Sequence, residues 1–207
     1  MQDLYGLGVA ETRGADASVA RAALALESKT FRSATALAVI HDRFKVHVVD
    51  TLGVPTERVG VFPNWSRQEP IPTVPRAEAL RQLGWESLED HVLVLHAGNM
   101  GVKQGLENVV RAAAIADGIP EKVMFVLLGD GNQRPRLEDL AAGVQSVRFV
   151  DVLDNRLFGY ALRAADILLL NQQAAISDMC VPSKMMSYYS AGRAAARGGQ
   201  RRWDQRS

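Results

Sequence analysis

Cysteine, long hydrophobic runs and net charge are nearly absent from this sequence, and each absence excludes a class of protein. Cys180 is the single cysteine of 207 residues, so no disulfide can form within the chain, and a reducing, cytoplasmic environment is the simplest expectation. No Cys or His spacing typical of a metal site is present, so we expect no bound metal. No stretch reaches the roughly 18 apolar residues of a membrane-spanning helix, and the first residues lack a signal-peptide layout. Any membrane contact is therefore expected to be peripheral, at the inner membrane face.

The charge balance argues against nucleic acid as a partner. The chain has 24 basic and 23 acidic side chains, which gives a net charge of +1. A protein that binds nucleic acid through its phosphates usually carries a broad basic surface. With 47% hydrophobic and 23% charged residues, the composition is instead typical of a globular chain of one or two domains.

Helical and strand patterns alternate along the chain. Such alternation requires parallel strands joined by right-handed crossovers, and it predicts an α/β fold with a doubly wound, Rossmann-like parallel sheet. Helices are expected at 15–34, 43–52, 77–83, 106–117, 133–142 and 156–165, and strands at 35–40, 59–62, 92–95, 123–128, 147–150 and 167–170.

A proline-rich stretch divides the sequence into two predicted domains. Pro70, Pro72 and Pro75 lie among polar residues, which is the composition of an exposed linker. The predicted organisation is a first domain at 1–66, a linker at 67–76, a second domain at 77–193 and an arginine-rich tail at 194–207 in which no strand pattern is recognised.

A phosphate-binding loop is predicted between the apolar strand at 92–95 and the amphipathic helix that follows it. We expect Gly98, Gly101 and Gly105 to let the backbone take positive φ angles and let a ligand approach the main chain. Lys103 adds a cation close to the start of the helix, where anions are favoured. An ordinary turn between strand and helix remains the alternative for this segment.

Three other features have two interpretations each. Pro182, Ser183 and Lys184 stand where a short helix would begin, either presenting N–H groups and a cation to a ligand or capping a surface helix. His96 either contacts a phosphate or sugar or is a strand-end histidine bonded to backbone. Tyr188 and its neighbours Met185, Met186 and Tyr189 are either packing residues or a platform for a sugar, and packing is the favoured interpretation.

Five segments, taken in order, resemble signatures of one enzyme family. They are QDLY near the start, 52–65, 96–107, 126–138 and 181–193. Together they resemble the retaining GT-B glycosyltransferases, in the branch that builds bacterial polysaccharides and related glycans.

The resemblance implies two facing Rossmann-like domains, of which the second binds a nucleoside diphosphate sugar and the first a glycan or lipid-linked acceptor. It implies no cofactor and no metal. Lys103 would act catalytically by stabilising the charge that grows on the departing diphosphate. The donor-binding residues implied are Gly98, Asn99, Met100, Gly101, Gly129, Asp130, Gly131, Pro182, Ser183, Lys184 and Ser187.

The sequence also departs from the family pattern. Many relatives carry glutamates where this chain has Met179 and Ser187, and a serine hydroxyl bonds a ribose more weakly than a carboxylate does. Asp178 lies one residue from the first of these positions. We expect that most of the acceptor domain is missing and that the end after Gly192 is aberrant. The chain is therefore expected to be a fragment, for which binding of the donor is a safer prediction than catalytic turnover. A nucleotide-sugar epimerase and a non-catalytic nucleotide-binding or interaction domain stay open as alternatives.

Overall fold

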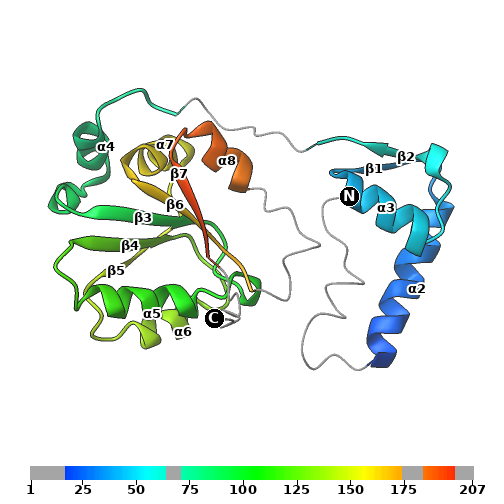
Figure 1. Cartoon of the computed structure of the whole chain (residues 1–207), viewed down its shortest axis with the longest axis horizontal. Coiled ribbons are helices and arrows are strands. Elements are labelled where there is room, and N and C mark those ends of the chain that lie inside the picture. Colours follow the sequence, from blue (N-terminus) through cyan, green and yellow to red (C-terminus); the bar gives the residue numbers. More distant parts are fainter. Residues whose placement is uncertain (1–16, 64–70, 174–183, 199–207) are drawn as a thin grey trace, which may run out of the picture. The chain divides into compact units, whose positions relative to one another are not determined.

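The computed structural model describes residues 17–63, 71–173 and 184–198, which fall into two compact units (Figure 1). The first unit contains the described residues up to 63. The second contains 71–173 and 184–198. Of the linker predicted at 67–76, residues 67–70 lie outside the described residues.

The first unit is a two-stranded parallel sheet packed against helices. Its elements are α2 (Ala17–Ser33), β1 (Leu37–Val39), α3 (Asp42–Val46), a π-helical turn (His47–Thr51), a 3₁₀ turn (Thr56–Arg58) and β2 (Val59–Val61). Leu37 pairs with Val59 in the parallel register. The helix predicted at 43–52 is therefore split between α3 and the π-helical turn. Phe44, Val48 and Leu52 from this segment lie in the core of the unit.

The second unit is a five-stranded, all-parallel sheet in the order β5-β4-β3-β6-β7. Its strands are β3 (Val92–Ala97), β4 (Val123–Leu128), β5 (Val147–Val150), β6 (Ile167–Asn171) and β7 (Ala194–Gly198). Its helices are α4 (Arg76–Leu83), α5 (Glu107–Ala116), α6 (Arg134–Leu140), α7 (Asn155–Ala164) and α8 (Lys184–Ser190), with 3₁₀ turns at Glu86–Leu88 and Val102–Gln104.

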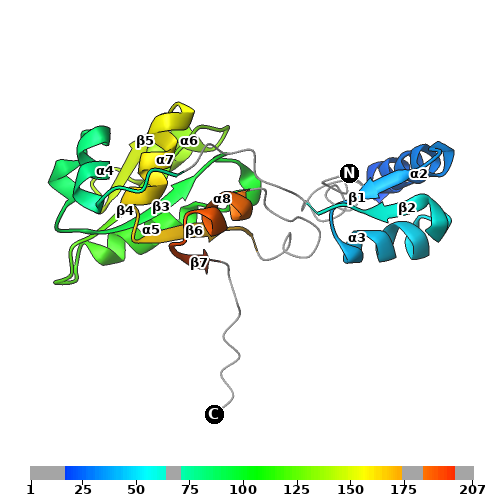
Figure 2. The ribbon, with the colours of Figure 1, turned by 90° about the horizontal axis from the view of Figure 1, so that it is seen from above.

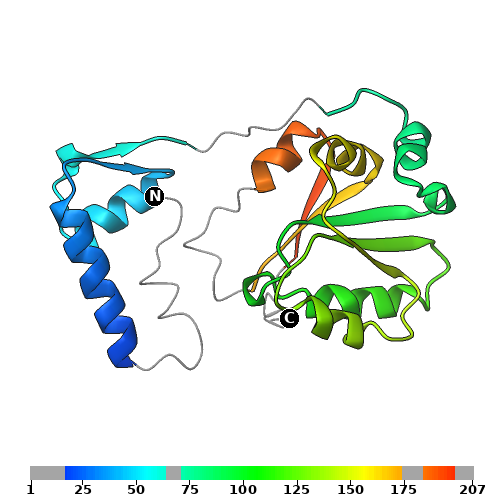
Figure 3. The same cartoon turned by 180° about the vertical axis from the view of Figure 1, so that it is seen from behind.

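Helices cover both faces of this sheet, so the doubly wound prediction is confirmed. Seen from above, α4, α7 and α8 lie over the strands (Figure 2), and α5 and α6 lie together on the opposite face (Figure 3). The central strand β3 sends Leu93 and Leu95 into the core beneath α4 and α7, and Val94 into the core beneath α5. An apolar run without alternation thus marks a strand that is buried on both sides.

The prediction that no strand follows Gly192 is wrong. Residues Ala194–Gly198 form β7, which pairs with β6 in the register Ile167↔Ala194 to Asn171↔Gly198. An edge strand is held by main-chain hydrogen bonds, which its side-chain pattern does not report. The alanines of β7 are exposed, so no apolar alternation was available to indicate it. Residues 199–207 lie outside the described residues.

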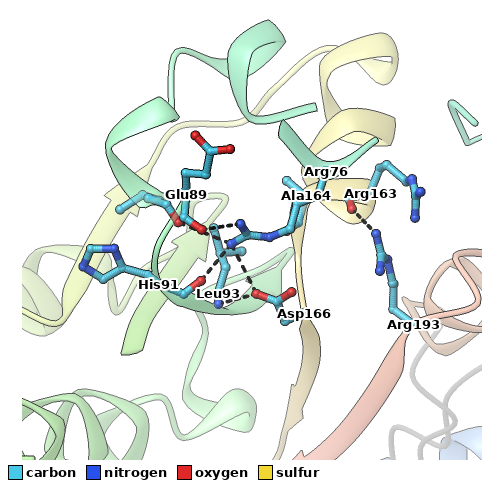
Figure 4. Close-up of polar contacts among 9 residues, drawn as sticks. Arg76, Glu89, His91, Leu93, Arg163, Ala164, Asp166 and Arg193 are labelled. Carbon is cyan, nitrogen blue, oxygen red and sulfur yellow. Dashed lines mark hydrogen bonds and ion pairs between the residues drawn. The ribbon is translucent and has the colours of Figure 1, made fainter. Parts of the chain in front are cut away.

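The amino edge of the sheet is closed by Arg76, the first residue of α4 (Figure 4). Its guanidinium donates to the carbonyl oxygens of Glu89, His91 and Ala164 at 2.7, 2.8 and 3.1 Å. It also forms an ion pair with Asp166 at 3.3 Å. One side chain therefore connects α4, α7 and the segments that lead into two strands.

Asp166 continues the same network into the sheet. Its Oδ2 accepts a hydrogen bond from the Leu93 N–H at 2.9 Å, and its own N–H donates to the Leu93 carbonyl at 3.0 Å. The polar groups at this edge thus satisfy one another.

We predict that Arg76→Ala lowers the free energy of unfolding by about 2 kcal/mol, because it leaves the Asp166 carboxylate and several carbonyls without their donor. Arg81→Ala on the same helix is the matched control. Arg81 is 63% exposed and pairs only with Glu78 among the described residues, so its loss should cost less than about 0.5 kcal/mol. Urea denaturation measures both, and equal midpoints for the two variants would contradict the structural role of Arg76.

Candidate functional site

The candidate site lies at the carboxyl edge of the second unit, where the loops after β3 and β4 meet. Ligands of doubly wound folds bind outside the carboxyl ends of the strands. Gly98–Gly101 follow β3 and Gly129–Gly131 follow β4, and these strands are direct neighbours in the sheet. The two loops predicted from separate motifs are thus brought together.

Main-chain hydrogen bonds join the two loops. The Gly98 N–H donates to the Leu128 carbonyl at 2.8 Å, and the Met100 N–H donates to the Asp130 carbonyl at 2.8 Å. The Met100 carbonyl accepts from the Gln133 N–H at 3.0 Å. Each loop therefore fixes the backbone of the other.

Glycine is required where these backbones touch. Gly129 has φ +132, and a Cβ placed on it would lie 2.1 Å from the Gly98 oxygen. Gly131 has φ +157, and a Cβ there would lie 2.5 Å from the Met100 oxygen. Neither distance is tolerable for a carbon atom. The GDG sequence after β4 is thus explained by close approach of two loops.

The φ expectation is correct for two of the three glycines after β3 and wrong for Gly101. Gly98 and Gly105 have φ +133 and +57, whereas Gly101 has φ −104. A Cβ on Gly101 would instead lie 2.8 Å from Asn99 Nδ2 and 3.0 Å from Gln104 Oε1. Both atoms are the ends of flexible side chains, so neither the backbone angle nor a fixed neighbour requires glycine at this position.

We predict that Gly129→Ala destabilises the chain by about 2 kcal/mol more than Gly143→Ala, because only the first substitution drives a Cβ into backbone. Gly143 has φ +85 but nothing within 4 Å of its Cβ position, so it measures the cost of the angle alone, about 1 kcal/mol. Thermal unfolding of the two variants gives the comparison. Equal losses would show that the loops do not press on each other.

Arg134 supports the second loop and was not anticipated from the sequence. Its guanidinium donates to the Gly129 carbonyl at 3.0 Å and contacts the carboxylates of Asp151 and Glu138 at 2.6 and 2.8 Å. The hydrogen bond to Glu138, and to a smaller extent the one to Asp151, raise the pKa of Arg134. The i, i+4 spacing of Arg134 and Glu138 is the sequence signal that could have indicated a held side chain. Its charge is neutralised by these partners.

Lys103 lies in the 3₁₀ turn Val102–Gln104, and α5 begins only at Glu107. The helix predicted from 106 thus begins within one residue of that position, and Lys103 lies in the loop before it. Gln104 Oε1 accepts a hydrogen bond from the Gly101 N–H at 3.0 Å, which ties the turn to the glycine loop. The Lys103 side chain is exposed and has no carboxylate partner among the described residues.

Lys184, the first residue of α8, places a second ammonium at the same edge. Its Nζ lies 3.4 Å from His96 Nε2 and 3.1 Å from the Cβ position of Gly98. Burial lowers the pKa of Lys184 to about 8. Within the described part of the chain no carboxylate pairs with it.

His96 is fully buried beside this ammonium. Burial, and to a smaller extent the nearby charge of Lys184, lower the pKa of His96 to about 3. The imidazole is therefore neutral, and its Nε2 can accept a hydrogen bond from Lys184. His96 acts as the partner of Lys184 rather than as an exposed group that could touch a ligand.

Tyr188 fixes α8 over the strand ends. Its hydroxyl accepts a hydrogen bond from the Ala97 N–H at 3.0 Å and donates to the Leu169 carbonyl at 3.4 Å, and burial raises the pKa of Tyr188 to about 12. The packing interpretation is confirmed for Tyr188. It is wrong for Tyr189, which is 63% exposed.

The remaining candidates differ in what they can offer a ligand. Asn99 and Asp130 are exposed, and Ser187 is partly buried on α8. The Met100 side chain is fully buried in the core beneath α5, so this residue shapes the loop and does not present its side chain. A donor-binding role for Asn99, Asp130 and Ser187 stays a prediction. Pro182, Ser183, Met179 and Asp178 lie outside the described residues.

No group of three or more His, Cys, Asp or Glu side chains in the described part of the chain could hold a metal ion. Of the helices described, none has the length and apolar character needed to cross a membrane.

Comparison with known proteins identifies relatives among glycosyltransferases. No protein-family model matches the chain. It is 30% identical over 193 residues to the putative colanic acid biosynthesis glycosyl transferase WcaI of Escherichia coli K12, a match that covers 91% of this chain and 46% of the relative. The chain therefore spans about half the length of this curated relative.

Solved structures show the same fold. WaaG, a glycosyltransferase involved in lipopolysaccharide biosynthesis, matches with a TM-score of 0.73 at 20% identity, over 94% of this chain and 54% of WaaG. Sucrose-phosphate synthase of Thermosynechococcus elongatus matches with 0.71 at 19% identity, over 92% and 48%. Anabaena HepE, solved with UDP and glucose, matches with 0.68 at 15% identity, over 84% and 47%. The chain is thus homologous to WcaI and has the fold of GT-B glycosyltransferases.

Proposed function

Because the chain is homologous to a glycosyltransferase and has the GT-B fold, we propose that its second unit binds the diphosphate of a nucleoside diphosphate sugar. The observation that carries the proposal is the pair of lysines, Lys103 and Lys184, at an edge lined by glycine loops. Neither ammonium is neutralised by a described carboxylate. A diphosphate supplies the missing negative charge.

The proposed reaction is transfer of the sugar from this donor to a glycan or lipid-linked acceptor, with retention of configuration. When the bond between the sugar and the diphosphate breaks, negative charge grows on the departing phosphate. Lys103 and Lys184 stabilise that charge more strongly as it grows, which lowers the barrier. Since two ammonium groups supply this charge, we propose that no metal ion or other cofactor is needed.

The names of the relatives support the kind of donor and acceptor. HepE was solved with UDP-glucose, which supports a uridine nucleotide as the first one to test. WcaI and WaaG are named for colanic acid and lipopolysaccharide biosynthesis, which supports a bacterial glycan as acceptor. We propose that the reaction takes place in the cytoplasm, with peripheral contact at the inner membrane face.

We predict that Lys103→Ala weakens UDP binding about tenfold or more, because a charge-assisted contact to phosphate is lost. Isothermal titration calorimetry of the full chain with UDP, GDP and ADP measures the affinity. Lys122→Ala is the matched control, since Lys122 precedes β4 at the amino edge of the sheet and pairs with Asp90. Equal affinity of the wild type and Lys103→Ala, or no binding to any of the three, would refute the donor site.

The affinity for UDP-glucose is predicted to fall as the pH rises through about 8. Lys184 is protonated below its pKa of about 8 and loses its charge above it, and a neutral amine attracts a diphosphate weakly. Lys184→Arg keeps its charge over this range, so its affinity should change little between about pH 7 and pH 9. If both proteins show the same profile, the ammonium of Lys184 is not part of the site.

A further inference from the structure

Asn171 holds the turn that carries Lys103, and we propose that it is a positioning residue for that lysine; this inference rests on the proposed function. Asn171 ends β6, and it is only 2% exposed. It therefore cannot act by binding a ligand directly. Its effect on the site must pass through the residues that it contacts.

The amide of Asn171 binds two main-chain carbonyls of the turn. Its Nδ2 lies 2.6 Å from the Gln104 oxygen and 3.0 Å from the Gly105 oxygen, and these two carbonyls share one of its two N–H donors. These carbonyls directly follow Lys103 in the sequence. Bonds from a buried side chain to consecutive carbonyls fix both the position and the tilt of the peptide groups that bear them.

The same amide is itself fixed by α5. Asn171 Nδ2 donates to Asn108 Oδ1 at 2.9 Å, and Asn108 Nδ2 donates to Asn171 Oδ1 at 3.2 Å. Two amides that face each other in this way restrict one another's rotation. The strand end, the turn and the helix are thus joined at one buried point.

A second contact from the strand end reaches Lys103 itself. The Gln173 N–H donates to the Lys103 carbonyl at 3.0 Å. Gly105 has φ +57, and a Cβ on it would lie 2.9 Å from Gln173 Cγ, so the backbone angle and the close approach of Gln173 both favour glycine at this position. Three successive carbonyls, those of Lys103, Gln104 and Gly105, are therefore bound by Asn171 and Gln173.

Holding the turn matters because an exposed lysine has many rotamers. A side chain that starts from a fixed backbone loses less entropy when it binds an anion than one on a moving loop. Inside the turn itself, two main-chain bonds span Lys103: Gly105 N–H to the Val102 carbonyl at 3.2 Å and Gln104 N–H to the Gly101 carbonyl at 3.1 Å. These bonds close the turn on itself, and the donors from the strand end are what attach it to the sheet.

A double-mutant cycle separates positioning from a purely structural role. UDP binding to the full chain is measured by calorimetry for the wild type, Asn171→Ala, Lys103→Ala and the double variant. We expect Asn171→Ala to weaken UDP binding about tenfold when Lys103 is present. In the Lys103→Ala background the same substitution should weaken binding by less than about twofold. Wild-type affinity in Asn171→Ala, or the same loss in both backgrounds, would overturn the positioning role.

Asp166→Ala serves as the stability control, because it removes a polar contact at the opposite end of β6. It should lower the melting temperature and leave UDP affinity unchanged. If it weakens binding as much as Asn171→Ala does, the effect of Asn171 is general loss of stability and the inference fails. Asn171→Ser, which keeps one donor, replaces Asn171→Ala if the latter does not fold, with the same criteria.

Hydrogen exchange tests the inference without nucleotide. The Gln104 and Gly105 amides should exchange faster in Asn171→Ala than in the wild type, while the Val126 amide in β4 should keep its rate. Unchanged exchange in the turn would refute the role of Asn171 even if UDP binds. If the wild type binds no UDP but the turn amides exchange faster in Asn171→Ala, the proposed function fails. The claim that Asn171 fixes the turn is then still supported.

Discussion

The contact between two glycine loops at the carboxyl edge of the sheet determines the shape of the candidate site. Gly98 and Gly129 approach so closely that no side chain fits between their backbones, and hydrogen bonds between the loops keep them there. Every group proposed to meet the donor depends on this contact. Lys184 lies over Gly98, and the turn with Lys103 is tied to Gly101 through Gln104.

Charge is distributed differently at the two edges of the sheet. At the amino edge, Arg76 and Asp166 neutralise each other and bind the surrounding carbonyls (Figure 4). At the carboxyl edge Arg134 is neutralised, whereas Lys103 and Lys184 have no described carboxylate partner. Burial without a counterion lowers the pKa of Lys184, which is a cost that an anion would relieve. The asymmetry is the physical argument for a ligand at one edge only.

The sequence predicts local features of this arrangement well and long-range ones poorly. The apolar run in β3 and the glycines after it can be recognised because the strand and its loop are contiguous. The role of Asn171 and the hydrogen bonds of Tyr188 could not be predicted, since their partners lie far away along the chain. Strand β7 was missed for a related reason: its stability comes from pairing with β6, which leaves no pattern in its own residues. The family resemblance located the lysines but could not tell which of them is buried.

The central claim is that a donor diphosphate binds at the carboxyl edge of the second unit. Titrating the ¹⁵N-labelled chain with UDP-glucose and following amide chemical shifts tests this most directly. The account predicts that the largest changes fall on the loop amides of Gly98–Gly105 and Gly129–Gly131, while Leu93 and Asp166 at the amino edge stay constant. Largest shifts at the amino edge or in the first unit, or no saturable shift anywhere, would contradict it.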